Sequence, residues 1–352
     1  MQNNLYLNKV EFKNDIINNY NKIIDVRSED EYYEDNIPNS INIPVLKNEQ
    51  RHIVGELYTR NIFEARKLGA QLISNNISNF LKKEKIKKLD KILLYCWRGG
   101  LRSLSMYLVL KNIGFNVHIL NKGYKSYRSF INNFFKNEVL KYNFNILSGL
   151  TGTGKTFFLE KLSKSLNVLN LEYIANHKGS VLGNIPKKVQ PSQKKFESIL
   201  WYELLKLGNE KNIWTESESN RIGKLSIPRN LFIKMIKGRT LNIEVPINKR
   251  AKFILKDYKY FTKEPKPVFQ TFNILKKFLT KKKMLEINLN LKTKNYEKFV
   301  LNLLEFHYDK VYKKRKYFTE ENVIERLSLN SINYKSSLLL SEYIKKHPVF
   351  KK

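Results

Sequence analysis

Residues 149–156 read GLTGTGKT, and they stand between an apolar run, NFNILS, and a segment with apolar residues at helical spacing, TFFLEKLSKSL. The stretch fits the pattern G-x-x-x-x-G-K-[ST] at every position. In that pattern a strand leads into a glycine-rich turn, and the turn opens a helix whose free amide groups face a phosphate. The flanking runs predict such a strand and such a helix. The stretch therefore predicts an α/β fold with a phosphate-binding turn formed by Gly149, Thr151, Gly152, Thr153, Gly154, Lys155 and Thr156.

Each fixed position of the pattern has a physical role. The glycines let backbone amides wrap a diphosphate, Lys155 neutralises its outer oxygens, and Thr156 offers a hydroxyl that can bind Mg²⁺. The acidic partner of such a turn usually ends another strand, and in NIWTESES (212–219) Glu216 ends the apolar run. We assign Glu216 as the candidate Mg²⁺-linked acid and predict no metal site built by the protein alone. Any diphosphate ester fits the turn, so the pattern does not specify a nucleotide.

Strand-like and helix-like segments alternate on both sides of this turn. A chain of 352 residues exceeds what one compact core usually organises, so two domains are expected. Alternating strands and helices predict mostly parallel sheets covered by helices on both faces. We predict an α/β domain over residues 1–140 and a second over 141–352, whose part after 247 reads as mainly helical and lysine-rich. The predicted strands of the first domain are KIIDV (22–26), SINIPV (40–45), KILLY (91–95) and VHILN (117–121); those of the second are NFNILS (143–148), NIWTE (212–216) and TLNIEVP (240–246), with VLNLEY (168–173) in the same alternation.

A second unusual stretch, YCWRGGLR (95–102), contains Cys96, the one cysteine of the chain. Because Cys96 directly follows the predicted strand KILLY, it lies where ligand sites of parallel sheets form. Two glycines allow the loop amides to point inward, and a thiol at a helix N-terminus beside arginines reacts as a thiolate. Five residues separate Cys96 from the next helix's arginine, which suits a ring around phosphate, sulfate or selenophosphate. The predicted catalytic loop comprises Cys96, Arg98, Gly99, Gly100 and Arg102; the alternative is a buried cysteine acting as a small hydrophobe.

Composition narrows the class of protein. The chain has 65 Lys and Arg against 32 Asp and Glu, a formal net charge of +33, which favours nucleic acid as a partner. Drift toward A/T-rich codons, which enriches lysine, is the alternative explanation. One cysteine excludes an intrachain disulfide and a cysteine-rich metal site. Apolar runs are too short to span a bilayer, so we expect a soluble, cytoplasmic protein that does not bind membranes.

Two further segments supply candidate substrate contacts. The stretch from Glu172 to Gly183 contains polar groups and glycines without metal-ligand spacing, and it reads either as a structural loop or as a substrate-contacting one. FHYDKVYKK (306–314) combines aromatics with lysines, as RNA-binding segments often do, although an amphipathic helix explains it equally well. The candidate contacts are Glu172, Asn176, His177, Arg221, His307 and Tyr308.

Longer motifs resemble known families. DVRSEDEYYEDNIPNSINIP (25–44), together with the cysteine loop, resembles the rhodanese domain. Together with the phosphate-binding turn (P-loop), the series YCWRGGLRS, NKGYKSYRSF, LEYIANHKGSVLG, QPSQKKFE, WTESESNRIG and FHYDKVY resembles the tRNA 2-selenouridine synthase family from about residue 20 to about residue 315. The chain departs from that family at Asn170, where an aspartate is expected, and at Lys178, where an arginine is expected.

The resemblance implies an activity. That family replaces the 2-thio sulfur of the wobble uridine of certain tRNAs with selenium from selenophosphate, through an S-geranyl-2-thiouridine made from geranyl diphosphate. The P-loop would hold the diphosphate, with Lys155 and Mg²⁺ stabilising its charge. The cysteine loop would bind selenophosphate, with Cys96 accepting or guiding selenium. The expected partners are therefore tRNA carrying 2-thiouridine, selenophosphate and geranyl diphosphate.

Three other functions fit parts of the sequence. An ATP-dependent tRNA sulfurtransferase, or a P-loop kinase fused to a sulfur-carrier rhodanese domain, would show Mg²⁺-dependent ATP turnover. A cysteine phosphatase would use the same cysteine loop but leave the second domain without a task. A non-catalytic RNA-binding module would not need the intact set of Cys96, Arg102, Lys155 and Thr156.

Overall fold

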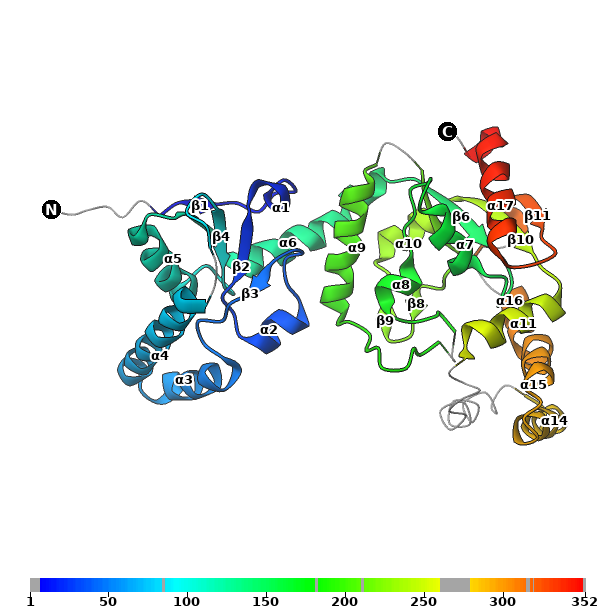
Figure 1. Ribbon diagram of the computed structural model, residues 1–352, viewed down its shortest axis with the longest axis horizontal. Coiled ribbons are helices and arrows are strands. Elements are labelled where there is room, and N and C mark those ends of the chain that lie inside the picture. The colour runs from blue at the N-terminus through cyan, green and yellow to red at the C-terminus, as the bar shows by residue number, and fades with distance from the viewer. Residues whose placement is uncertain are drawn as a thin grey trace. The chain divides into compact units, whose positions relative to one another are not determined.

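The computed structural model describes residues 7–83, 86–180, 183–209, 212–259, 279–314, 317–318 and 320–350. The chain forms two compact units (Figure 1). The first unit comprises Met1–Phe134 and Pro191–Leu205, and the second comprises Phe135–Gln190 and Lys206–Lys352. The sequence placed a single division at residue 140; in the structure the segment Pro191–Leu205 packs with the first unit although it follows the P-loop in the chain.

The first unit contains a parallel five-stranded sheet in the order β1-β5-β4-β2-β3. Its central strand is the apolar run KILLY, whose last four residues are buried. The helices include α2, which begins after a capping box formed by Ser28 and Glu31. The elements are β1 Lys9–Val10, α1 Ile16–Asn19, β2 Lys22–Asp25, α2 Glu29–Glu34, β3 Ile41–Asn42, α3 Asn48–Arg60, α4 Ile62–Lys83, β4 Lys91–Tyr95, α5 Leu101–Ile113, β5 Asn116–Leu120 and α6 Gly123–Lys136.

A helix from later in the chain completes this unit. The helix α9 spans Gln193–Leu207, and its Trp201 is fully buried. The Trp201 ring contacts Phe12, Tyr127 and Phe130 at centroid distances of 5.8, 5.9 and 5.8 Å. Burying such a large aromatic surface is strongly favourable, which explains why this part of α9 belongs to the first unit.

The second unit contains a parallel four-stranded sheet in the order β11-β10-β6-β7. The P-loop strand β6 is central and buried along its whole length. The α/β class and the parallel sheets predicted from sequence are confirmed in both units. The elements are η1 Glu138–Lys141, β6 Phe144–Ser148, α7 Lys155–Leu162, α8 Leu171–Ala175, β7 Ile213–Glu216, β8 Arg221–Ile222, β9 Leu225–Ser226, α10 Arg229–Ile236, β10 Arg239–Glu244, α11 Ile247–Asp257, α14 Lys281–Lys292, α15 Tyr296–Leu303, η3 Leu304–Tyr308, α16 Asp309–Lys313, η4 Glu320–Asn322, β11 Val323–Ser328, α17 Tyr334–Lys346 and η5 Pro348–Phe350.

The structure corrects the sequence prediction at two places. The part after residue 247 is not only helical, because β11 pairs in parallel with β10 at the edge of the sheet. Its side chains alternate between half-buried and exposed, so it lacks the apolar run that marks a buried strand. The stretch VLNLEY forms one bridge, from Val168 to Trp214, and then helix α8. Asn170 caps this helix by accepting a hydrogen bond from the Tyr173 amide at 2.9 Å, a role that asparagine and aspartate fill equally well.

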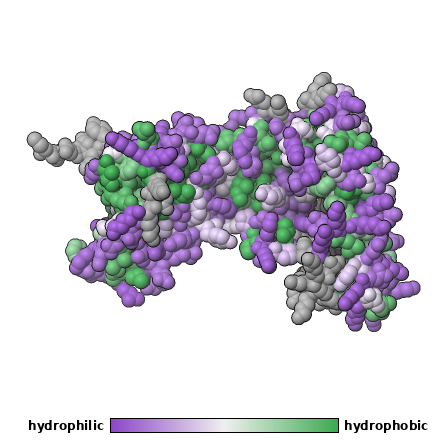
Figure 2. All heavy atoms as spheres, in the orientation of Figure 1, coloured by the Kyte–Doolittle hydropathy of each residue, from purple (hydrophilic) through white to green (hydrophobic). Residues whose placement is uncertain are grey.

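The surface is mostly polar. Figure 2 shows hydrophilic side chains over most of the visible face of each unit, in line with the many lysines. Within the described segments, no helix has both the length and the apolar character required to cross a membrane.

Candidate functional site

The cysteine loop lies between the C-terminal end of β4 and the N-termini of two helices. The helix α5 begins at Leu101 with Gly100 as its cap, and α6 begins at Gly123. Amides in the first turn of α6 donate to the loop, from Tyr124 to the Cys96 carbonyl at 2.8 Å and from Lys125 to the Trp97 carbonyl at 3.1 Å. A Cβ at position 123 would lie 2.2 Å from the Cys96 carbonyl oxygen, so a larger residue there would push the loop away. Helix packing thus fixes the backbone of the loop.

The Cys96 sulfur is buried but has a polar neighbour. The residue is 3% exposed and packs with Met106 and Tyr107 in the apolar cluster of the unit. Its Sγ lies 3.3 Å from the Ser103 hydroxyl, whose one proton is within reach of both this sulfur and the Gly100 carbonyl at 3.1 Å. Ser103 was not among the residues predicted from the sequence. The feature that indicates it is its position one helical turn after the glycine pair, which turns its side chain back toward the loop. The site therefore contains a hydroxyl beside the thiol.

The two predicted arginines differ in their surroundings. Arg98 is exposed, whereas Arg102 is paired with Glu31 through N–O distances of 2.7 and 3.4 Å. Glu31 also pairs with Arg51 at 3.1 Å. Burial alone would raise the pKa of Glu31, but the hydrogen bond and charge of Arg102, with Arg51, hold this pKa below its ordinary value. The guanidinium of Arg102 is therefore oriented by a carboxylate that sequence analysis did not include in the site.

We predict that Ser103→Ala lowers the alkylation rate of Cys96 by iodoacetamide at neutral pH roughly tenfold, because a hydrogen bond to a charged group is worth about 1.5–3 kcal/mol. Since Cys96 is the one cysteine, mass spectrometry of the intact chain reports its labelling directly. Ser105→Ala is the matched control, because Ser105 is half-buried on the same helix and its hydroxyl donates to the Leu101 carbonyl at 2.9 Å. Equal rates for the two variants would remove Ser103 from the site.

The P-loop of the second unit has the predicted form. Gly149, Gly152 and Gly154 have φ values of 156°, 81° and 82°, which favour glycine, and α7 begins at Lys155. The Lys155 ammonium donates to the Gly149 carbonyl at 2.8 Å. The Thr153 side chain is buried and donates to the Leu150 carbonyl at 2.9 Å, so it shapes the loop from within. The structure therefore gives Thr153 a supporting role within the loop, while the loop amides and Lys155 stay the predicted phosphate contacts.

A carboxylate cluster lies beside Thr156. Its hydroxyl donates to Glu172 at 2.5 Å, and Glu216 accepts from the Glu172 amide at 2.8 Å. Burial, and then the charges of Glu218 and Glu216, raise the pKa of Glu172. Burial, with the charge of Glu218, raises the pKa of Glu216 to about 7. The acid that contacts Thr156 is thus Glu172, which was predicted as a substrate contact, whereas Glu216, the predicted Mg²⁺-linked acid, holds the start of α8 in place.

A carboxyl whose pKa is higher in the folded chain than in the unfolded chain binds more protons when folded, so stability falls as pH rises between the two values. For Glu216 this interval runs from the ordinary 4.5 to about 7. We predict that Glu216→Gln is more stable than the unsubstituted chain by roughly 2–3 kcal/mol at pH 8, and that the difference shrinks toward zero at pH 4.5. Urea unfolding at several pH values tests this, with the exposed Glu64→Gln as control; a pH-independent difference contradicts the shift.

Residues from the helical part of the second unit reach the P-loop. Arg250 of α11 donates to the Thr151 carbonyl at 3.0 Å and pairs with both carboxylate oxygens of Asp309 at 2.9 and 2.8 Å. The Tyr312 hydroxyl lies 2.6 Å from the Ser148 hydroxyl and accepts from the Gly149 amide at 3.1 Å. FHYDKVY therefore reaches the P-loop directly through Tyr312 and, by way of Arg250, through Asp309, two connections that the sequence did not predict.

The remaining predicted contacts are spread over the second unit. His307 is 7% exposed within the π-helix η3 and stacks edge-on against Tyr308 at 5.0 Å, so its ring is part of the helical packing. Asn176 ends α8 with a left-handed φ of 50°, and His177 is 4% exposed, with burial lowering its pKa. Arg221 is exposed in the hairpin β8–β9. The structure brings His177 near this hairpin, because a Cβ at Gly223 would lie 2.9 Å from its ring.

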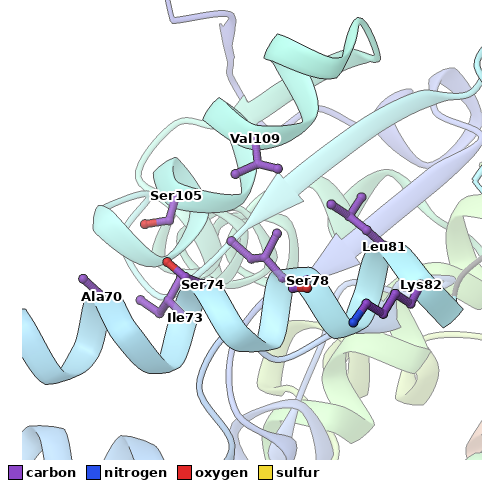
Figure 3. Close-up of a pocket in the computed structure, with 9 residues that line it drawn as sticks. Ala70, Ile73, Ser74, Ser78, Leu81, Lys82, Ser105 and Val109 are labelled. Carbon is purple, nitrogen blue, oxygen red and sulfur yellow. The ribbon is translucent and has the colours of Figure 1, made fainter.

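The first unit also has a surface groove of about 510 Å³ between α4 and α5 (Figure 3). Figure 3 shows Ser74 and Ser78 of α4 facing Ser105 and Val109 of α5. None of its lining residues belongs to the cysteine loop, so we assign it no part in the site.

The two loops and the sheets that carry them define a class of protein: a rhodanese-like domain followed by a P-loop domain. Residues 9–130 match the family model described as a rhodanese-like domain, and residues 142–283 match the one described as the tRNA 2-selenouridine synthase AAA domain. The chain belongs to the tRNA 2-selenouridine synthase family.

Curated relatives support this assignment. A tRNA 2-selenouridine synthase of Marinobacter nauticus is 34% identical over 72% of this chain and 68% of its own length. One of Sulfurovum sp. is 31% identical over 70% of the chain and 68% of its length. One of Nitrosomonas eutropha is 32% identical over 67% of the chain and 62% of its length. The chain thus spans somewhat under two thirds of the length of some of the relatives that it matches.

Proposed function

We propose that this chain converts 2-thiouridine at the wobble position of tRNA into 2-selenouridine, using geranyl diphosphate and selenophosphate. The observation that carries the proposal is a pair of glycine-containing loops, each leading into a helix N-terminus, one with the sulfur of Cys96 and one with the ammonium of Lys155. Membership of the family supplies the substrate class.

The first step of the proposed reaction belongs to the P-loop. The 2-thio sulfur of the uridine attacks C1 of geranyl diphosphate, so that a carbon–sulfur bond forms and the carbon–oxygen bond to diphosphate breaks. Charge then accumulates on the departing diphosphate, where preorganised donors stabilise it most. The amides of the loop and Lys155 are those donors.

Mg²⁺ fits this loop. The Thr156 hydroxyl and the Glu172 carboxylate are hard oxygen donors in mutual contact, the kind of ligand that Mg²⁺ prefers, and the ion takes further oxygens from phosphate and water. When bound, Mg²⁺ neutralises part of the diphosphate charge. Thr156 and Glu172 would hold it, and Glu216 supports Glu172 through the backbone.

The second step belongs to the cysteine loop. Selenium of selenophosphate attacks C2 of the S-geranylated base, a carbon–selenium bond forms, and geranylthiolate leaves. Water then cleaves the phosphorus–selenium bond and releases phosphate. The loop amides hold the phosphate part of the reagent, and Cys96 guides its selenium to the base.

The test is mass analysis of nucleosides from 2-thiouridine tRNA incubated with the protein and both reagents, each omitted in turn. We expect 2-selenouridine with the complete mixture, S-geranyl-2-thiouridine without selenophosphate, and unchanged 2-thiouridine without geranyl diphosphate. A requirement for ATP in place of geranyl diphosphate would support the sulfurtransferase or kinase alternative instead.

A further inference from the structure

Trp97 differs from the other tryptophans of the chain in its exposure. Trp201 and Trp214 are 0% and 2% exposed, whereas Trp97, directly after Cys96, is half-buried. Partial exposure of one tryptophan is common in itself, but this ring directly follows the cysteine of the loop. Its surroundings therefore decide whether it can contact a substrate.

The Trp97 ring packs against the ring of Tyr124. It lies 5.2 Å from the ring of Tyr124, centroid to centroid, with 31° between the planes. The Arg27 guanidinium lies 4.0 Å from the centre of the same Tyr124 ring, which is a cation–π contact. Three groups, an indole, a phenol and a guanidinium, are therefore stacked in sequence.

Buried hydrogen bonds fix the lower layers of this stack. Arg27 donates to Asp25 at 2.6 Å and to the Asp35 carbonyl at 2.7 Å. The Tyr124 hydroxyl donates to the Asp35 carboxylate at 2.8 Å, and burial, with the Asp35 charge, raises the pKa of Tyr124, so the phenol remains a donor. These contacts hold the Tyr124 ring in place. Because the Trp97 ring packs on it, Trp97 loses little conformational entropy when a ligand binds.

Three exposed cationic residues have their backbones close to that of Trp97. Arg98 follows it in the loop, and Lys122 and Lys125 stand at the start of α6, where the Lys125 amide donates to the Trp97 carbonyl. Lys122 is close to the loop, since a Cβ at Gly99 would lie 3.3 Å from its amide nitrogen. An aromatic surface bordered by cations is the arrangement with which proteins bind single-stranded RNA, stacking on a base and pairing with its phosphates.

We propose that Trp97 is the surface on which the pyrimidine base of the substrate nucleotide stacks, placing its C2 substituent beside the Cys96 loop, while Arg98, Lys122 and Lys125 contact the flanking phosphates. This inference rests on the proposed function, because it assigns the base whose sulfur is exchanged. An isoprenoid chain is a less suitable ligand, since it would gain nothing from the three cations.

Two RNAs that differ in one base test the inference. One is an anticodon stem–loop with 2-thiouridine at the wobble position, and the other has an abasic site there, with the same phosphates. We expect the unsubstituted protein to bind the first about tenfold more tightly, because stacking of one base is worth about 1–3 kcal/mol. Trp97→Ala should bind both RNAs equally, and Trp97→Phe should retain most of the difference.

Controls distinguish a loss of base stacking from a disturbed cysteine loop and from a failure of the proposed function. Lys125→Gln should weaken binding of both RNAs alike. Iodoacetamide labelling of Cys96 should be the same in Trp97→Ala as in the unsubstituted chain if the loop is intact. A full preference for the base-containing RNA in Trp97→Ala, or no preference in the unsubstituted protein, overturns the inference. If the base preference depends on Trp97 but no selenium enters the RNA, the proposed function fails while base stacking stands.

Discussion

Cys96→Ala is expected to abolish the formation of 2-selenouridine, while S-geranyl-2-thiouridine still accumulates. The side chain lies in the loop assigned to selenophosphate, at the N-terminus of α5, whereas the diphosphate loop lies in the other unit. Removing the sulfur therefore removes the second step and leaves the first. The measurement is mass analysis of nucleosides after incubation with both reagents.

The control for Cys96→Ala is Ser105→Ala, a change at a half-buried position on the same helix, which should leave both products at their usual amounts. Cys96→Ser tests whether an oxygen can replace the sulfur. Because the proposal assigns the guiding of selenium to the sulfur, we expect no selenium incorporation. Normal 2-selenouridine from Cys96→Ala would remove the thiol from the mechanism.

Lys155→Ala is expected to reduce S-geranyl-2-thiouridine formation on the order of 10²- to 10³-fold, the usual effect of losing one preorganised donor to developing charge. In the structure Lys155 is the first residue of α7, and its ammonium donates to the Gly149 carbonyl. The ammonium therefore lies beside the loop. The rate of diphosphate release from geranyl diphosphate in the presence of 2-thiouridine RNA measures the effect.

The matched control is Lys161→Ala, on the same helix but paired with Glu160 away from the loop. It should leave the rate within about twofold of that of the unsubstituted chain. If Lys155→Ala and Lys161→Ala release diphosphate at the same rate, the P-loop does not hold the leaving group.

The sequence predicted those features that depend on residues close together in the chain. KILLY, VHILN and NFNILS are short apolar runs, and such runs favour buried strands. The two glycine-rich loops were also predictable, since their left-handed glycines and the helices that follow are local features. Strand β11 escaped prediction because its sequence VIERLS neither forms an apolar run nor alternates polar and apolar residues, although its burial alternates.

Contacts between distant residues could not be read from local patterns. Arg102 pairs with Glu31, 71 positions earlier, so the arginine predicted to encircle an anion is already held by a carboxylate. Tyr312 reaches Ser148 across 164 positions, and Arg250 reaches Thr151 across 99. Glu216 of NIWTESES was predicted as the acid linked to the P-loop, but the fold shows that Glu172 is the one that contacts Thr156.

We propose that the two loops perform two successive steps on one RNA. The most direct test is a relay: 2-thiouridine RNA is first treated with Cys96→Ala and geranyl diphosphate, purified, and then given to Lys155→Ala with selenophosphate. We expect 2-selenouridine to form in this second reaction, although neither variant by itself makes it from 2-thiouridine RNA. Failure of the purified S-geranyl RNA to yield 2-selenouridine, when the unsubstituted chain converts the same RNA, would contradict the division of steps between the two loops.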